Sequence, residues 1–119
     1  MTIREVLAQV KRLKPSTYED ALLLRWLSEC EGYVTADVAS WHDVDAPVLP
    51  YTEDRLDETL LAKLPYDELY VQYLCAKIDQ ANGDYDRYQN DMSAFNDTMQ
   101  GFGAWFNRTH SVIRKDITI

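Results

Sequence analysis

Few residues in this chain could do chemistry, and the densest group surrounds its first histidine. His42, Asp43 and Asp45 place three potential metal ligands within four positions. A metal site needs a defined geometry and usually a fourth protein group. The second histidine, His110, lies far along the chain at the expected end of a helix. We therefore expect no functional metal site and no cofactor.

Motifs for phosphate binding and nucleophilic catalysis are also lacking. No glycine-rich loop follows a predicted strand, and no nucleophile lies in a strand–turn–helix elbow. The 20 acidic residues are too scattered for one catalytic pair to be singled out, so solvation of the surface is their default role. The sequence predicts that the protein is not an enzyme. A small hydrolase-like or metal-dependent enzyme is the alternative.

The composition limits what the protein can bind. The 119 residues carry a net charge of −8, whereas a nucleic-acid-binding protein needs a basic surface to neutralise phosphates. No secretory leader opens the chain, and no apolar run approaches the roughly 18 residues of a membrane span. Cys30 and Cys75 are expected as buried free thiols in helices of a cytosolic protein. We expect no membrane, no sequence-specific nucleic acid and no small-molecule substrate as partner.

The strongest pattern is a helical hairpin over about 65–82 and 84–109. Pro65 suits a first helical turn, because its missing N–H would have no partner there. Gly83 suits the left-handed conformation that ends a helix, and Asp84 can cap the next one. Apolar residues recur in both helices at three- and four-residue spacing. In the second helix this seam consists of Tyr85, Tyr88, Met92, Phe95, Met99, Phe102 and Phe106.

Two further helices are predicted before the hairpin. A capping box at Thr2–Glu5 opens a helix over 3–13, and a second one at Ser16–Glu19 opens a helix over 17–39. The wide apolar face of the second helix predicts that it is the central one, in contact on two sides. The predicted fold class is therefore all-α, a small four-helix single domain over 1–119.

Two segments break the helical pattern. Residues 40–63 are predicted to form an irregular acidic arm, because seven acidic residues stand against one basic residue between Asp37 and Glu58. Irregular segments of this length are often functional, so we interpret the arm as partner-binding. Residues 111–119 are rich in β-branched side chains, which predicts an extended tail that drapes over the domain or pairs with another chain.

The far end of the last helix is a third candidate contact. With about 26 residues against about 18, this helix is expected to extend about 12 Å beyond its antiparallel partner. Either the first two helices cover the aromatic residues there or a neighbouring subunit does. The partner-interface candidates from the three regions are Trp41, Leu49, Tyr51, Phe102, Trp105, Val112, Ile113, Ile117 and Ile119.

Four runs of the chain carry a resemblance: Pro65–Tyr70, Ala76–Asp79, Asn82–Tyr88 and Trp105–Arg108. They resemble small proteins encoded in the head-morphogenesis clusters of tailed phages and prophages, which are similar to head–tail connector (adaptor) subunits. The resemblance covers about residues 1–110 and includes no catalytic motif.

The resemblance implies a structural role. It predicts an all-helical subunit that forms a ring homo-oligomer next to the portal and contacts portal- and tail-side phage proteins. It also implies assembly in the bacterial host cytoplasm and a place in the virion. The alternative is a cytosolic helical adaptor or regulatory interaction module that has no part in virions.

Overall fold

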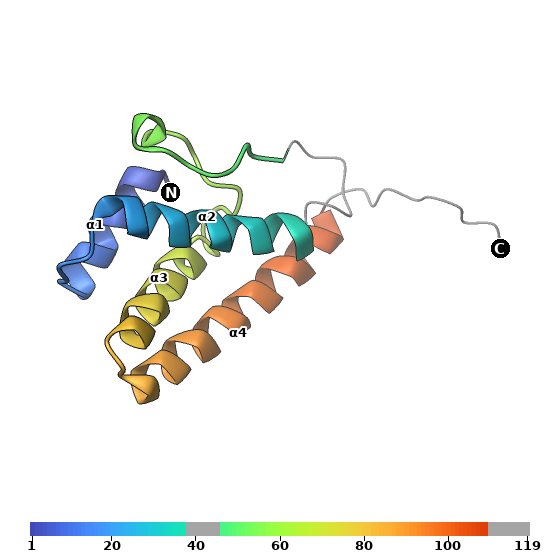
Figure 1. The fold of residues 1–119 in the computed structure, drawn as a ribbon. Coiled ribbons are helices and arrows are strands. Elements are labelled where there is room, and N and C mark those ends of the chain that lie inside the picture. The colour runs from blue at the N-terminus through green and yellow to red at the C-terminus, as the bar shows by residue number, and fades with distance from the viewer. Residues whose placement is uncertain (38–45, 110–119) are drawn as a thin grey trace.

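The computed structural model describes residues 1–37 and 46–109, and these residues form four α-helices and one 3-10 turn. The predicted all-α fold class is confirmed. No β-strand occurs in the described ranges beyond an isolated bridge between Thr2 and Thr59. The elements, labelled in Figure 1, are α1 (Ile3–Leu13), α2 (Asp20–Asp37), η2 (Glu53–Arg55), α3 (Glu68–Ala81) and α4 (Tyr85–Thr109).

The N-terminus of α1 forms the predicted capping box. The backbone N–H of Glu5 donates to Thr2 Oγ1 at 3.2 Å, and the N–H of Thr2 donates to Glu5 Oε1 at 3.0 Å. The next two N–H groups donate to the irregular segment, residues 46–63: Ile3 donates to the carbonyl of Glu58 and Arg4 to that of Leu56. A remote segment thus satisfies donors that have no partner inside the helix.

The start of α2 was predicted too early. The helix begins at Asp20, and the carbonyl of Glu19 accepts the N–H groups of Leu22 and Leu23. The preceding residues do not continue the helix, because Tyr18 is held elsewhere. Its hydroxyl donates to Asn82 at 2.8 Å, and its ring packs edge-on against Trp26.

The start of α3 was also predicted too early. The helix begins at Glu68 and has 14 residues, and Pro65 lies outside it after a cis peptide bond. The residues before it form turns, with the N–H of Tyr66 donating to the carbonyl of Lys63. The Tyr66 ring packs against Phe102 of α4 at 5.8 Å between ring centroids. This contact turns the segment towards α4 and away from the helix axis.

The central helix is α3, and the prediction that α2 is central was wrong. α3 packs against α1, α2 and α4, and nine of its 14 residues are buried. A helix that is apolar nearly all round is expected to be surrounded by others. Figure 1 shows α3 between the crossing helices α1 and α2 and its antiparallel neighbour α4.

The turn between α3 and α4 follows the local sequence signals. Gly83 has a φ of 79°, the left-handed conformation that ends a helix. Asp84 accepts the N–H of Arg87 at 3.4 Å, which is the predicted cap of α4.

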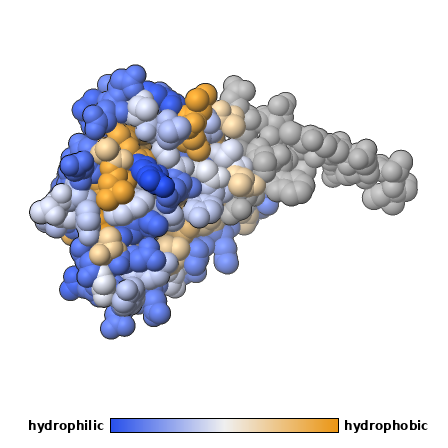
Figure 2. Space-filling view, viewed as in Figure 1, coloured by the Kyte–Doolittle hydropathy of each residue, from blue (hydrophilic) through white to orange (hydrophobic). Residues whose placement is uncertain are grey.

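The irregular segment packs against the domain where it is described. Tyr51, Leu60 and Ala62 are buried, so residues 46–63 are not a free arm. Arg55 fixes its course by donating to the carbonyls of Val48 and Pro50. Residues 38–45 and the predicted tail at 111–119 lie outside the described residues. On the face seen in Figure 2 the surface is mainly hydrophilic, with separate hydrophobic patches.

Candidate functional site

An open groove of about 390 Å³ lies between the end of α2, the second half of α3 and the first half of α4. Its walls are mostly aromatic and methionine side chains, with one cation and two amides. The lining residues are Tyr33, Tyr73, Lys77, Gln80, Tyr88, Met92, Phe95, Asn96 and Met99.

Aromatic rings join the three helices along this groove. The ring of Tyr73 lies 5.2 Å from that of Phe95 and 6.0 Å from that of Tyr33, both in tilted or edge-on arrangements. Such pairs are favourable because the positive ring edge meets the negative ring face. Tyr73 and Phe95 are buried, whereas Tyr33 is 54% exposed and forms an accessible edge of the groove.

The polar wall of the groove is organised by Glu29. Its Oε2 accepts the hydroxyl of Tyr73 at 3.3 Å and lies 3.8 Å from Nζ of Lys77. Lys77 also lies 6.0 Å from the centre of the Trp26 ring. Burial, reinforced by Glu29, raises the pKa of Tyr73, so its phenol stays protonated and acts as a donor at neutral pH. This wall presents fixed polar groups beside the apolar lining.

The seam of α4 is open at its beginning and closed at its end. Tyr85 is 63% exposed, and Tyr88, Met92 and Met99 are partly exposed. Phe102 and Phe106, in contrast, are only 1% and 3% exposed. The end of α4 is therefore not an uncovered overhang, because the chain itself buries it.

The predicted interface residues fall into three groups. Tyr51 and Phe102 belong to the hydrophobic core of this chain, so they offer almost no surface to a partner. Leu49 and Trp105 are partly buried and pack against that core. The remaining five lie outside the described residues, and their role stays a prediction: Trp41, Val112, Ile113, Ile117 and Ile119.

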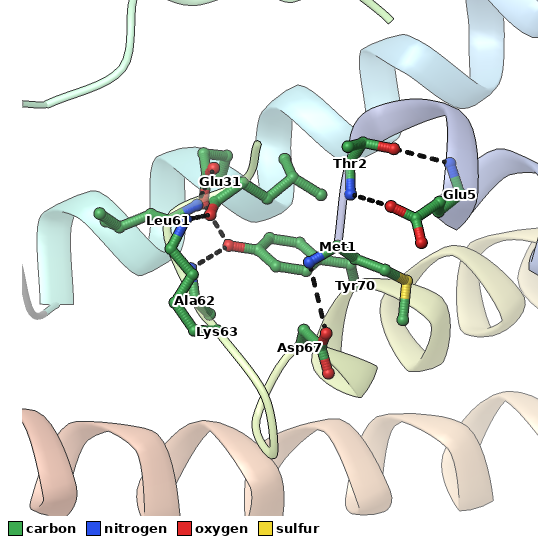
Figure 3. A network of polar contacts seen from close by, with 10 residues as sticks. Met1, Thr2, Glu5, Glu31, Leu61, Ala62, Lys63, Asp67 and Tyr70 are labelled. Atoms are coloured by element: carbon green, nitrogen blue, oxygen red, sulfur yellow. Dashed lines mark hydrogen bonds and ion pairs between the residues drawn. The ribbon is translucent and has the colours of Figure 1, made fainter. Parts of the chain in front are cut away.

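A buried carboxylate, missed in the sequence, ties the irregular segment to α2 and α3. Glu31 is fully buried, and its Oε1 accepts the hydroxyl of Tyr70 at 2.6 Å. Its Oε2 accepts the hydroxyl of Tyr51 at 2.9 Å and the N–H of Leu61 at 3.0 Å. The Tyr70 hydroxyl in turn accepts the N–H of Ala62 (Figure 3). We name Glu31, Tyr51, Leu61, Ala62 and Tyr70 the Glu31 clasp.

The Glu31 clasp is a structural connection with satisfied polar groups. Burial and the neighbouring Glu31 raise the pKa values of Tyr51 and Tyr70, so both phenols remain donors at neutral pH. A signal for the buried acid was present in the sequence, since Glu31 lies on the apolar face four residues after Leu27 and three before Val34. Its hydrogen-bond partners are 20 to 39 residues away, beyond any local pattern.

A second polar cluster joins the ends of α1, α3 and α4. Lys14 Nζ donates to both carboxylate oxygens of Asp79, at 2.9 and 2.8 Å, and lies 3.7 Å from Asp91 Oδ2. Burial, with a hydrogen bond to Asp79, raises the pKa of Asp91 to about 6. Burial also acts to raise the pKa of Asp79, but the hydrogen bonds from Asp91 and Lys14 outweigh it and lower that pKa.

The two cysteines are free and buried, as predicted. Burial raises the pKa of both thiols, to about 11 for Cys75, which keeps them protonated and unreactive at neutral pH.

Residues 1–37 and 46–109 contain neither a metal-binding cluster nor a helix suited to a membrane span. No group of three or more His, Cys, Asp or Glu side chains there is placed to hold a metal ion. None of the helices in these ranges is long and apolar enough to cross a membrane. The potential ligands His42, Asp43 and Asp45, at which no functional metal site is expected, lie outside these ranges.

Comparison of the chain with protein-family models, with curated proteins and with solved structures gives no match.

Proposed function

We propose that this chain is a structural subunit that binds other proteins through the groove, and that it serves as a head–tail connector (adaptor) of a tailed phage or prophage. The observation that carries the proposal is the groove itself. It exposes aromatic and methionine side chains along a seam that the described residues leave half covered.

The chemistry of the groove suits a protein segment. Aromatic residues and methionine are enriched at protein interfaces, and methionine adapts its shape to different apolar partners. The amides of Gln80 and Asn96 can hydrogen-bond the backbone of a bound segment, and both residues are exposed. In this reading the protein is not an enzyme, and the groove serves recognition and assembly.

The connector role is supported by the resemblance of four runs of sequence, two of which meet in space. Tyr66, from Pro65–Tyr70, packs against Trp105, from Trp105–Arg108, at 5.7 Å between ring centroids. A third run contains Gly83 and Asp84, the turn that sets α4 against α3. The runs thus lie at the two ends of the helical hairpin and hold it together. In the proposed role, copies of this subunit contact one another within a ring next to the portal, and the ring contacts the portal- and tail-side proteins.

The test is deletion of this gene from an inducible phage genome that encodes it, with complementation from a plasmid. We expect electron micrographs to show heads without attached tails in the deletion, and tailed particles once the gene is restored. Normal tailed particles in the deletion would contradict the connector role. In that case a helical adaptor that has no part in virions would be the better description of the protein, with the same groove as its binding surface.

A further inference from the structure

We propose that the groove receives residues 112–119 from a second copy of this chain. The inference rests on the proposed function, because a ring places copies side by side. It goes further by naming the occupant and the residues that hold it.

The size and lining of the groove favour a short apolar segment. A volume of about 390 Å³ is near the lower end of the roughly 300–1,000 Å³ typical of ligand sites. It suits a few branched side chains better than a whole helix. Residues 112–119 include four such side chains, Val112, Ile113, Ile117 and Ile119. They would pack against Met92, Phe95 and Met99 in the wall formed by α4.

The charges of the two parts are complementary. Residues 110–119 contain two of the 12 basic residues and one of the 20 acidic residues, so they carry a net charge of +1 and the rest of the chain carries −9. Arg114 and Lys115 lie between the two apolar pairs. Glu29 at the polar wall has a side chain that is 38% exposed, and Asp97 is exposed beside the lining residue Asn96. Both carboxylates lie outside the lining, where the one charged side chain is Lys77, which Glu29 faces at 3.8 Å. The complementarity is therefore that of the overall charge of the two parts, with acidic groups at the margin of the groove.

The reach of the chain favours a second copy over the same copy. From Met99, the nearest groove residue, α4 continues for ten residues to Thr109, about 15 Å at 1.5 Å per residue. A segment returning along the helix would use about four residues to reverse and about five to cover that distance. Only one or two of residues 110–119 would then reach the groove. A segment from a neighbouring copy has no such limit.

A binding measurement with a matched pair of variants tests the contact. A fluorescein-labelled peptide of residues 110–119 is titrated with the full chain and followed by fluorescence anisotropy. Asn96→Arg introduces a bulky cation at an exposed groove residue. Asn90→Arg makes the same change on the same helix at an exposed position outside the lining. Because both variants change the charge equally, only the position differs.

We expect the parent and Asn90→Arg to bind the peptide alike and Asn96→Arg to bind it at least about tenfold more weakly. A peptide carrying Ile113→Asp and Ile117→Asp should also bind at least about tenfold more weakly to the parent. Equal binding by the two arginine variants, or no binding to the parent, would overturn the proposal.

The same variants separate this inference from the connector role. Particles that assemble normally with Asn96→Arg, while the gene deletion still blocks tail attachment, would overturn the groove contact and leave the connector role standing. Peptide binding that is lost only in Asn96→Arg would support the contact even if the deletion left particles normal, and the connector role would then be the part that fails.

Discussion

The two halves of α4 carry the same apolar spacing but have different surroundings. In the second half, Phe102 and Phe106 are almost completely buried, whereas in the first half Tyr85 is 63% exposed and Met92 lines an open groove. The periodicity of a helix therefore marks the face that can be buried. What covers that face depends on segments far away in the chain.

The cover of the second half comes largely from a segment without regular structure. Tyr66 packs against Phe102 and Trp105, and a Cβ placed on Gly101 would lie 3.3 Å from its ring. Glycine at this position therefore lets the Tyr66 ring approach the helix backbone closely. The first half has α3 alongside, with Tyr33 of α2 against Tyr73 and Lys14, next to α1, against Asp79 and Asp91. Within residues 1–37 and 46–109, these neighbours leave the groove along this half open.

The largest expected effect is the loss of a ring from the closed half. Phe102→Ala should lower the free energy of unfolding by about 3–5 kcal/mol, because it leaves a cavity at a fully enclosed position. Tyr85→Ala in the open half should change it by only about 0.5 kcal/mol. Urea denaturation of both variants measures the difference. Similar losses in the two variants would contradict the distinction between the halves.

The Glu31 clasp should come next, because it holds the irregular segment that leads to Tyr66. In the parent, the two carboxylate oxygens of Glu31 accept three hydrogen bonds. Glu31→Gln keeps the shape of the side chain but replaces one of these acceptor oxygens with an NH2 donor. We expect a loss of about 1–3 kcal/mol, the cost of an unsatisfied buried polar group. Amide exchange of Leu61 should accelerate with it. An unchanged exchange rate at Leu61 would show that Glu31 does not hold the segment.

The pair Asp79 and Asp91 should give a smaller effect that depends on pH. The pKa of Asp91 is raised to about 6 in the folded protein. The protonated carboxyl therefore stabilises the fold fully at pH values below its ordinary pKa near 4, and this stabilisation is lost as the pH rises through about 6. Asp79 has a lowered pKa, so its negative charge stabilises the fold at pH values above its ordinary pKa. This stabilisation is lost only in stronger acid. Lys14 faces both carboxylates, and Arg87 also acts on Asp79.

Asp91→Asn removes the group that ionises near pH 6 and leaves Lys14 paired with Asp79. Relative to the parent, the variant should gain of order 1 kcal/mol between pH 4 and pH 7.5. Thermal melting at these two pH values measures the gain. A stability difference that is the same at both would mean that Asp91 does not hold a proton in the folded protein.

The smallest effect on stability is expected in the groove. Asn96→Arg and Asn90→Arg alter exposed positions of α4, so each should shift the free energy of unfolding by no more than about 0.5 kcal/mol. Urea denaturation checks this equality. A marked loss in Asn96→Arg alone would mean that the groove is part of the core.

Local signals in the sequence predicted much of the helical framework. The capping box of α1, the turn at Gly83 and the cap at Asp84 depend on neighbouring residues, and all are confirmed. The starts of α2 and α3 were misplaced because Tyr18 and Tyr66 are held by remote residues. Local rules do not include such competition.

The candidate site could be predicted only in part for the same reason. Tyr73, Tyr88, Met92, Phe95 and Met99 all lie on the predicted apolar stripes of the hairpin. The open part of the seam is set by the path of residues 46–67 across the helices. That path depends on the Glu31 clasp, which joins positions 20 to 39 residues apart. The sequence therefore indicated the seam, but the interface candidates that it gave on α4, Phe102 and Trp105, lie at the closed end.

The most direct test of the groove as an assembly surface is complementation of the gene deletion by the two matched variants. We expect Asn90→Arg to restore tailed particles in electron micrographs and Asn96→Arg to leave heads without tails, although both proteins are equally stable. Equal restoration by the two variants would contradict a role for the groove in assembly.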